Sequence, residues 1–205
     1  MGCLKSILKK ILIIALIFAF FAFGGYAFVK DKIKQYQYPP RDNFVETEKD
    51  YADFSKVSAD YQMRRSFNLF GYKKVYAFYS PTEQKIAIYD LKGEDLISVS
   101  DFYTGEINEK IETILNKTKD SIITYENFKI TSNGKYYAAN KTIPYIKYET
   151  EVKNLPLKEL TGVVAAYSSE DKKQKTSTKL IVYVANKKSF NPKIIQDFVE
   201  SLRFE

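Results

Sequence analysis

The side chains that could carry chemistry in this chain are carboxylates, lysines and hydroxyls. The 205 residues include no histidine and a single cysteine, Cys3. Without histidine, the chain cannot build a Ser-His-Asp or Cys-His nucleophile system or a histidine-ligated zinc site. Without a cysteine after Cys3, it cannot use thiolate catalysis in its main body or form an intramolecular disulfide. Glycine-rich nucleotide-binding loops are also missing, so carboxylate chemistry is the main enzymatic option.

Two groups of acids lie close together in the sequence: Asp50, Asp53 and Asp60, and the pair Glu149 and Glu151. A glycosidase needs two carboxylates across a cleft, and a calcium loop needs Asp-x-Asp-x-Asp-Gly spacing. The aspartates lack that spacing, and the glutamates project from the polar face of an expected strand. We therefore expect the acids of both groups to have structural or solvent-facing roles. We predict no catalytic, metal-binding or cofactor-binding residues and no cofactor.

The basic residues give a net charge of +7. They are scattered along the chain, which does not favour a nucleic-acid partner. Lys172, Lys173 and Lys175, together with Lys179, predict a basic loop tip between two strands. Such a tip could contact anionic lipid or an acidic partner, but a solvated hairpin tip is the interpretation that we favour.

Residues 11–29 form an uncharged apolar stretch with lysines on both sides. As a helix it would extend about 28 Å, which is close to the thickness of the hydrocarbon core of a bilayer. This predicts a transmembrane helix and makes the membrane the first expected partner. The alternative is a cleaved signal peptide with Ala22-Phe23-Gly24 as the cleavage site, but the apolar run is long for that purpose and continues past the site.

The tail before the anchor is short and basic, and such tails usually stay in the cytoplasm. We therefore expect a single-pass protein whose C-terminal domain is extracytoplasmic. The start Met1-Gly2-Cys3 fits the pattern for N-myristoylation with a palmitoylated cysteine. A basic tail with an incidental cysteine is the interpretation that we favour.

The expected organisation has four parts. A basic tail covers residues 1–10, the anchor covers 11–29, a polar juxtamembrane spacer covers 30–40, and one folded domain covers 41–205. Pro39-Pro40 should disfavour helix before them and stiffen the exit from the spacer.

Within the domain, residues 41–65 are expected to be mostly loop with a short edge strand. Strand-like runs follow at residues 67–69, 73–79, 84–91, 122–131, 135–139, 146–152, 160–167 and 179–185. Ser80-Pro81-Thr82-Glu83 predicts a hairpin because proline suits the second position of a turn. Ser132-Asn133-Gly134 predicts another, because Asn and Gly tolerate positive φ.

Two amphipathic helices are predicted. Over residues 106–118 the apolar positions recur at helical spacing, and they are Ile107, Ile111, Ile114 and Leu115. The last helix has Asn191 as its N-cap, Pro192 at its first position and a second apolar stripe, which consists of Ile195, Phe198, Val199 and Leu202. The expected fold is therefore α+β, with an antiparallel sheet flanked by two amphipathic helices and preceded by the anchor.

This order of hairpin, helix, strands and closing helix, ending in Ser201-Leu202-Arg203-Phe204, resembles the PsbP-like family of photosystem II extrinsic subunits. The resemblance covers residues 66–205. It implies an α-β-α sandwich that serves as a binding or assembly module. The chain lacks the family's aromatic-rich N-terminal strand pattern with Trp, and no functional residue carries over.

The sequence thus favours a membrane-anchored, non-catalytic module of the cell envelope that binds an envelope protein or a small ligand. Two alternatives remain open. One is a carboxylate-dependent envelope enzyme, for example a glycan hydrolase. The other is a carrier of lipids or other hydrophobic molecules, with its cavity between the sheet and the C-terminal helix.

Overall fold

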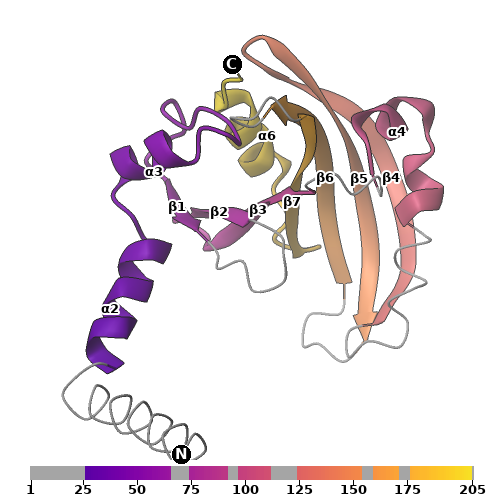
Figure 1. Cartoon of the computed structure of the whole chain (residues 1–205). Helices are drawn as coiled ribbons and strands as arrows, with labels where there is room; N and C mark the ends of the chain where they lie inside the picture. Colours follow the sequence, from indigo (N-terminus) through magenta and orange to yellow (C-terminus); the bar gives the residue numbers. More distant parts are fainter. Residues whose placement is uncertain are drawn as a thin grey trace, which may run out of the picture. The chain divides into compact units, whose positions relative to one another are not determined.

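The computed structural model describes residues 26–65, 74–91, 97–111, 124–153, 159–170 and 176–204. The chain divides into two compact units, Met1–Pro39 and Pro40–Glu205. The second unit is built on a seven-stranded antiparallel sheet with helices packed against it, as Figure 1 shows. The prediction of an α+β fold with an antiparallel sheet is therefore confirmed.

In the first unit, helix α2 covers Tyr26–Gln37. The expectation that Pro39-Pro40 would disfavour helix before them was wrong for most of the spacer, because the clash with proline acts on the residue next to it, Tyr38, and α2 ends just before that residue. The spacer over residues 30–40, which the sequence presented only as polar, is thus largely helical. The predicted membrane helix over residues 11–29 lies outside the described residues except where α2 begins. None of the helices in the described ranges is long and apolar enough to cross a bilayer.

The prediction that residues 41–65 are mostly loop was wrong for their first turns. Helix α3 covers Arg41–Thr47, and the expected edge strand follows as β1, Tyr61–Arg65. The sequence did not predict this helix because two turns are too short to show a helical period of apolar residues. Phe44 holds this helix against the core. It is fully buried, and its ring lies 5.3 Å from that of Phe54.

Six further strands complete the sheet: β2 (Lys74–Tyr79), β3 (Gln84–Asp90), β4 (Thr124–Ala138), β5 (Lys141–Lys153), β6 (Glu159–Glu170) and β7 (Thr176–Asn186). Their order is β1-β2-β3-β7-β6-β5-β4. The β2–β3 hairpin around Pro81 is confirmed, as are the strands that became β6 and β7. The strand expected over residues 67–69 lies outside the described residues.

The predicted hairpin at Ser132-Asn133-Gly134 was wrong. These residues lie within β4, where Asn133 pairs with Ile146 and Gly134 with Tyr145. The chain turns instead after Ala138, which pairs with Lys141 across a two-residue loop. The later turn lets the hairpin bury Tyr136, Ala138 and Ile143 in one core cluster. This burial outweighs the local preference of Asn-Gly for a turn.

Strand β4 contains two irregularities that change which way its side chains point. The pairing with β5 shifts by one residue between Glu126 and Lys129, and again between Ile130 and Ser132. Each extra residue reverses the alternation of faces along the strand. Ile130 and Tyr136 therefore pack on opposite faces of the sheet, although they lie an even number of positions apart.

Each face of the sheet carries its own core. Helix α6 (Pro192–Ser201) covers the first, which we call the α6 face, and buries Ile195, Phe198, Val199 and Leu202 there. The predicted stripe is thus confirmed. The predicted cap is confirmed as well, because Asn191 Oδ1 accepts a hydrogen bond from the Lys193 amide at 3.0 Å.

Helix α4 (Val99–Thr104) covers the opposite face, which we call the α4 face; Figure 1 shows α4 and α6 on the two sides of the sheet. The sequence had not predicted α4. It is separated from the expected helix by Gly105, whose φ of +83° ends the first turns. The expected helix is present over residues 107–111, with Ile107 buried against Phe102, and its remainder to residue 118 lies outside the described residues.

Two tyrosines of β5 lie over the glycines that face them across the strands. The ring of Tyr145 covers Gly134 on the α6 face and stacks on Tyr136 at 4.3 Å, whereas Tyr148 covers Gly162 on the α4 face and stacks on Phe128 at 5.2 Å. A Cβ at Gly162 would lie too close to Tyr148 Cζ for a van der Waals contact. These glycines are therefore needed for space, because an added methyl group would displace a packed ring.

We expect Gly162→Ala to lower the free energy of unfolding by about 1–3 kcal/mol, because overpacking displaces the Tyr148 ring or the strand. Urea denaturation of the single variant and of the double variant Gly162→Ala/Tyr148→Leu measures the effect. The smaller leucine should recover part of the loss. Equal losses in the presence and absence of the Tyr148 ring would contradict the assigned contact.

Candidate binding surface

The aspartates that the sequence grouped together do not converge on one site. Asp53 accepts hydrogen bonds from the amide (2.8 Å) and hydroxyl (2.9 Å) of Ser55. Asp60 accepts one from the Ser58 hydroxyl at 3.1 Å. Asp50 contributes its backbone carbonyl, which accepts a hydrogen bond from Ser169 Oγ. These contacts shape the loop between α3 and β1, and each of the three aspartates has a different partner.

The pair Glu149 and Glu151 lies on β5. Glu149 pairs with Lys187 at 2.7 Å, and this hydrogen bond lowers the pKa of the Glu149 carboxyl. Glu151 faces Glu126 on one neighbouring strand and Glu159 on the other. The described parts of the chain contain no group of three or more acids, cysteines or histidines that could hold a metal ion.

A buried polar cluster was missed at the sequence level. Lys179 on β7 pairs with Asp90 on β3 at 2.8 Å, and only 1% of Lys179 and 7% of Asp90 is exposed. The Lys179 ammonium also donates to Ser177 Oγ at 2.8 Å and lies 5.0 Å from the centre of the Tyr51 ring. Next to them, Tyr167 donates to the Tyr51 carbonyl at 2.9 Å, and burial raises the pKa of Tyr167.

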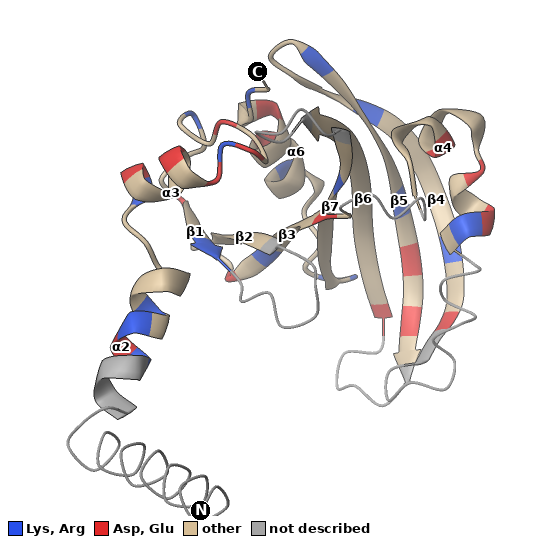
Figure 2. Cartoon of the chain, in the orientation of Figure 1, with Lys and Arg blue, Asp and Glu red and all other residues tan. Residues whose placement is uncertain are grey.

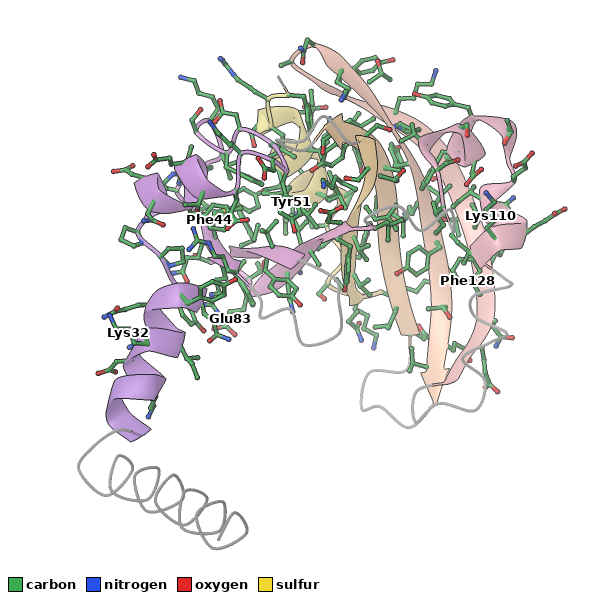
Figure 3. All side chains as sticks on the ribbon, viewed as in Figure 1. Lys32, Phe44, Tyr51, Glu83, Lys110 and Phe128 are labelled. Carbon is green, nitrogen blue, oxygen red and sulfur yellow. The ribbon has the colours of Figure 1, made fainter. Side chains whose placement is uncertain are left out.

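The placement of Lys179 in a basic loop tip was therefore wrong; the other lysines of that tip, residues 172–175, lie outside the described residues. Lys179, like Ile181 and Tyr183, occupies every second position of β7, so these side chains point to the same face of the sheet. Ile181 and Tyr183 are fully buried on the α6 face. This parity was the one signal in the sequence that could have placed Lys179 inside. Figure 3 shows Tyr51 where the segment after α3 meets the sheet. Because Tyr51 covers the Asp90–Lys179 pair, the cluster can fix this segment in place but cannot take a substrate from solvent.

The two buried carboxylates of the described chain lie on opposite faces of the sheet. Asp90 shares the α6 face with Ile86 and Ile88, while Asp101 lies at the start of α4 beside Phe102. Each is held by a lysine, Asp90 by Lys179 and Asp101 by Lys110. They cannot act on one bond as an acid–base pair.

Asp101 gives the domain a specific dependence on pH. Burial raises the pKa of Asp101, but hydrogen bonds from Lys110 Nζ (2.8 Å) and the Ser98 amide (2.7 Å) outweigh this and hold the pKa below its ordinary value. A depressed folded-state pKa contributes stability that is present above the unfolded-state pKa and is lost as pH falls through the folded-state pKa.

We therefore expect the urea midpoint to fall as pH drops below about 4, the region where aspartate titrates in the unfolded chain. Asp101→Asn should flatten this decline, because the amide has no charge to lose. Urea titrations of both proteins between about pH 6 and pH 2.5 make the comparison. An unchanged pH slope in the variant would show that Asp101 does not contribute.

The most exposed aromatic residues of the described domain lie together at the outer end of the α4 face. Tyr137 is 70% exposed and Tyr103 of α4 is 52% exposed. Lys135 lies two residues before Tyr137 on the same face of β4, and its Nζ is 5.3 Å from the centre of the Tyr103 ring. Asn133, two residues before Lys135 on β4, is also exposed and points to the same face. We call these four residues the outer hairpin face.

The reverse side of the same hairpin is buried. Tyr136 and Ala138 pack into the α6-side core, and Asn140 donates to the Phe204 carbonyl at 3.0 Å. The buried side of the hairpin is thus packed against the core. On the opposite side, Tyr137 and Lys135 of the hairpin and Tyr103 of α4 are exposed to solvent. A rigid support under amphipathic aromatic side chains is typical of a protein-binding surface.

Charge is unevenly distributed along this hairpin. Between residues 127 and 148 the chain has four lysines and no acid, whereas Glu126, Glu149 and Glu151 lie at the other end. Figure 2 shows this separation, with basic bands toward the tip of the β4–β5 hairpin and acidic bands lower on β4, β5 and β6. The outer hairpin face is therefore at the basic end.

Comparison of the chain with family models, curated proteins and solved structures found no match.

Proposed function

We propose that this protein is a membrane-anchored, non-catalytic binding or assembly module of the cell envelope, and that it contacts its partner through the outer hairpin face. The observation that carries the proposal is the exposure of Tyr103 and Tyr137 beside Lys135 on a hairpin whose other side is tightly packed. Tyrosine is favoured in interfaces because it offers a large contact area at low entropic cost.

The anchor part of the proposal is supported by the uncharged stretch at residues 11–29 and the lysines around it. We propose that the anchor remains attached, crosses the bilayer once and holds the domain outside the cytoplasm. The PsbP-like α-β-α sandwich belongs to the same proposal, and it is supported by the order of elements in the sequence over residues 66–205. We retain that resemblance as a proposal about the fold.

The two alternatives have less support. A carboxylate-dependent enzyme needs two acids that share a cleft, whereas the buried acids Asp90 and Asp101 are separated by the sheet. A hydrophobe carrier needs space between the sheet and α6. That space is filled by Phe198 and its neighbours, and the Phe198 ring lies 5.3 Å from the ring of Tyr61.

Membrane fractionation tests the anchor. The full chain should stay in the membrane pellet after a sodium carbonate wash, and a variant without residues 1–29 should move to the supernatant. Protease added to intact spheroplasts should digest the domain if it is extracytoplasmic. A full chain that washes off the membrane would remove the tether from the proposed function.

Site-specific photocrosslinking tests the binding surface. A photoreactive phenylalanine at position 137 of the full chain should give discrete adducts with an envelope protein in cells. The same group at Glu83, an exposed residue on the β2–β3 turn that is labelled in Figure 3, is the control and should give none. Adducts at both positions would indicate non-specific contact, and adducts at neither would refute the binding surface.

A further inference from the structure

Strand β4 forms one edge of the sheet and is hydrogen-bonded to a neighbouring strand on one side, β5. The outer row of backbone donors and acceptors on an edge strand is a template for another strand. Proteins usually protect such edges with bulges, and β4 has two, both before Ser132. From Ser132 to Ala138 the pairing with β5 is unbroken, residue for residue. The protected part of the edge therefore ends where the outer hairpin face begins.

The chemistry along this regular segment indicates what would bind there. Lys135 is exposed at its centre, and no acidic residue occurs between positions 127 and 148. Lys141 and Lys147 contribute charge nearby, although their ammonium groups are directed to the Ser168 carbonyl and the Phe190 ring. An incoming strand with carboxylates would meet complementary charge from the exposed Lys135, and the nearest acids of the hairpin, Glu126 and Glu149, lie outside the segment 127–148.

Other occupants fit less well. A second copy of the chain would bring the same lysines, Lys129 and Lys135, against this edge, and like charges across a strand pair are destabilising. A lipid surface would make use of the tyrosines and lysine, but it cannot satisfy a row of backbone hydrogen-bonding groups. An extended peptide satisfies both the backbone and the charge.

We propose that the edge segment Ser132–Ala138 binds an extended, acidic segment of a partner protein by strand addition, with Lys135 and Tyr137 contacting its side chains. This inference rests on the proposed function and names the chemistry of the partner at the same surface. Strand addition draws its affinity from backbone hydrogen bonds and its specificity from alternate side chains. It therefore predicts separate sensitivity to the peptide backbone and to the sign of the peptide charge.

The test uses the full chain in neutral phosphatidylcholine nanodiscs. Fluorescence anisotropy measures binding of a nine-residue peptide that alternates valine and aspartate. A peptide that alternates valine and lysine reports the effect of charge, and a third peptide, with N-methyl groups on the three central residues of the acidic sequence, reports the effect of the backbone. We expect the acidic peptide to bind at least about tenfold more tightly than either control, since each control lacks one of the two contributions.

Variants and hydrogen exchange locate the contact. Lys135→Glu should weaken the acidic peptide and strengthen the lysine peptide. Lys188→Glu makes the same charge change at an exposed position in the β7–α6 turn. It should alter both affinities less than about twofold, because salt screens the interaction between distant exposed charges. Amides within Ser132–Ala138 should exchange more slowly when the acidic peptide is bound. Protection elsewhere would overturn the inference, even if the peptide binds.

Three other outcomes would also overturn it. Equal affinity for the methylated peptide would mean that no strand is added. A Lys135→Cys/Cys3→Ser variant tests for a second copy of the chain. If its disulfide-linked dimers form at the same rate with and without the peptide, the occupant is a second copy. Protection of Ser132–Ala138 by phosphatidylserine nanodiscs alone would indicate a lipid surface. If adducts at position 137 persist while no strand peptide binds, the edge inference fails and the proposed function stands; if both are missing, both fail.

Discussion

Asp90→Ala should lower the free energy of unfolding by about 3–5 kcal/mol, which is the usual cost of removing one partner from a buried ion pair. The reason is that Lys179 stays behind: only 1% of it is exposed, and its ammonium group lies 2.8 Å from the lost carboxylate. Ser177 and the Tyr51 ring are too weakly polar to replace a full negative charge. Equilibrium unfolding in urea, followed by circular dichroism, measures the loss.

The matched control replaces both partners. Asp90→Leu/Lys179→Met fills the same volume without charge and should be close to the parent in stability, because the desolvation cost of both ions disappears. Lys187→Ala breaks the exposed pair with Glu149 and should leave the urea midpoint unchanged within error. If Asp90→Ala costs no more than Lys187→Ala, the Asp90–Lys179 pair is solvated in solution and the buried cluster does not exist as described.

A variant with a loosened cluster should also lose order in the segment that follows α3. Tyr51 covers the ion pair, and its carbonyl accepts the Tyr167 hydroxyl. Asp50 is tied to Ser169, and Asp53 pairs with Arg203 through two backbone hydrogen bonds of 2.8 and 3.2 Å. The cluster therefore joins the segment that follows α3 to the sheet.

Elements with strong local signals were predictable from the sequence. Helix α6 has a cap, a proline at its first position and a four-residue stripe, and all of these follow from contacts within one element and its docking face. The β2–β3 hairpin likewise depends on the four residues of its turn. In both cases, the residues that decide the structure are neighbours in the sequence.

Features that depend on distant residues were not predictable. Asn133-Gly134 has the local chemistry of a turn, but Gly134 pairs with Tyr145 on β5, and the Tyr145 ring stacks on Tyr136. Lys179 looked like part of a polar loop because Asp90, which makes its burial tolerable, lies about ninety positions earlier in the chain. A partner in another part of the chain can reverse a local preference, and its identity is known only once the strands are ordered.

The outer hairpin face illustrates the same limit at the candidate site. Tyr136 and Tyr137 are adjacent and chemically identical, yet Tyr136 is buried and Tyr137 is the most exposed large apolar residue described. The bulges earlier in β4 decide which of the two tyrosines is exposed to solvent. Each extra residue moves the side chains that follow it to the opposite face of the sheet. Bulges carry no dependable sequence signature, so the exposed tyrosine could not be distinguished in advance from the buried one.

Phe198→Ala should be the second strongly destabilising change, at about 3–5 kcal/mol, the range observed when a buried aromatic side chain is removed from a core. Phe198 is fully buried at the centre of the α6 stripe and packs against the Tyr61 ring, whose hydroxyl donates to the Ile194 carbonyl at 2.7 Å. A ten-residue helix has little stability of its own. Its attachment to the sheet therefore depends on such contacts.

The control lies on the same helix: Lys193→Ala changes an exposed side chain and should stay within about 0.5 kcal/mol of the parent. Hydrogen exchange adds a spatial test. The chain after α6 pairs with Asp53 through Arg203, so loosening α6 should speed exchange of the Asp53 and Arg203 amides. The amides of β2 and β3 should change less, because these strands keep their neighbours on both sides. Uniform acceleration across the sheet would mean that Phe198 supports the whole fold and not the docking of α6 in particular.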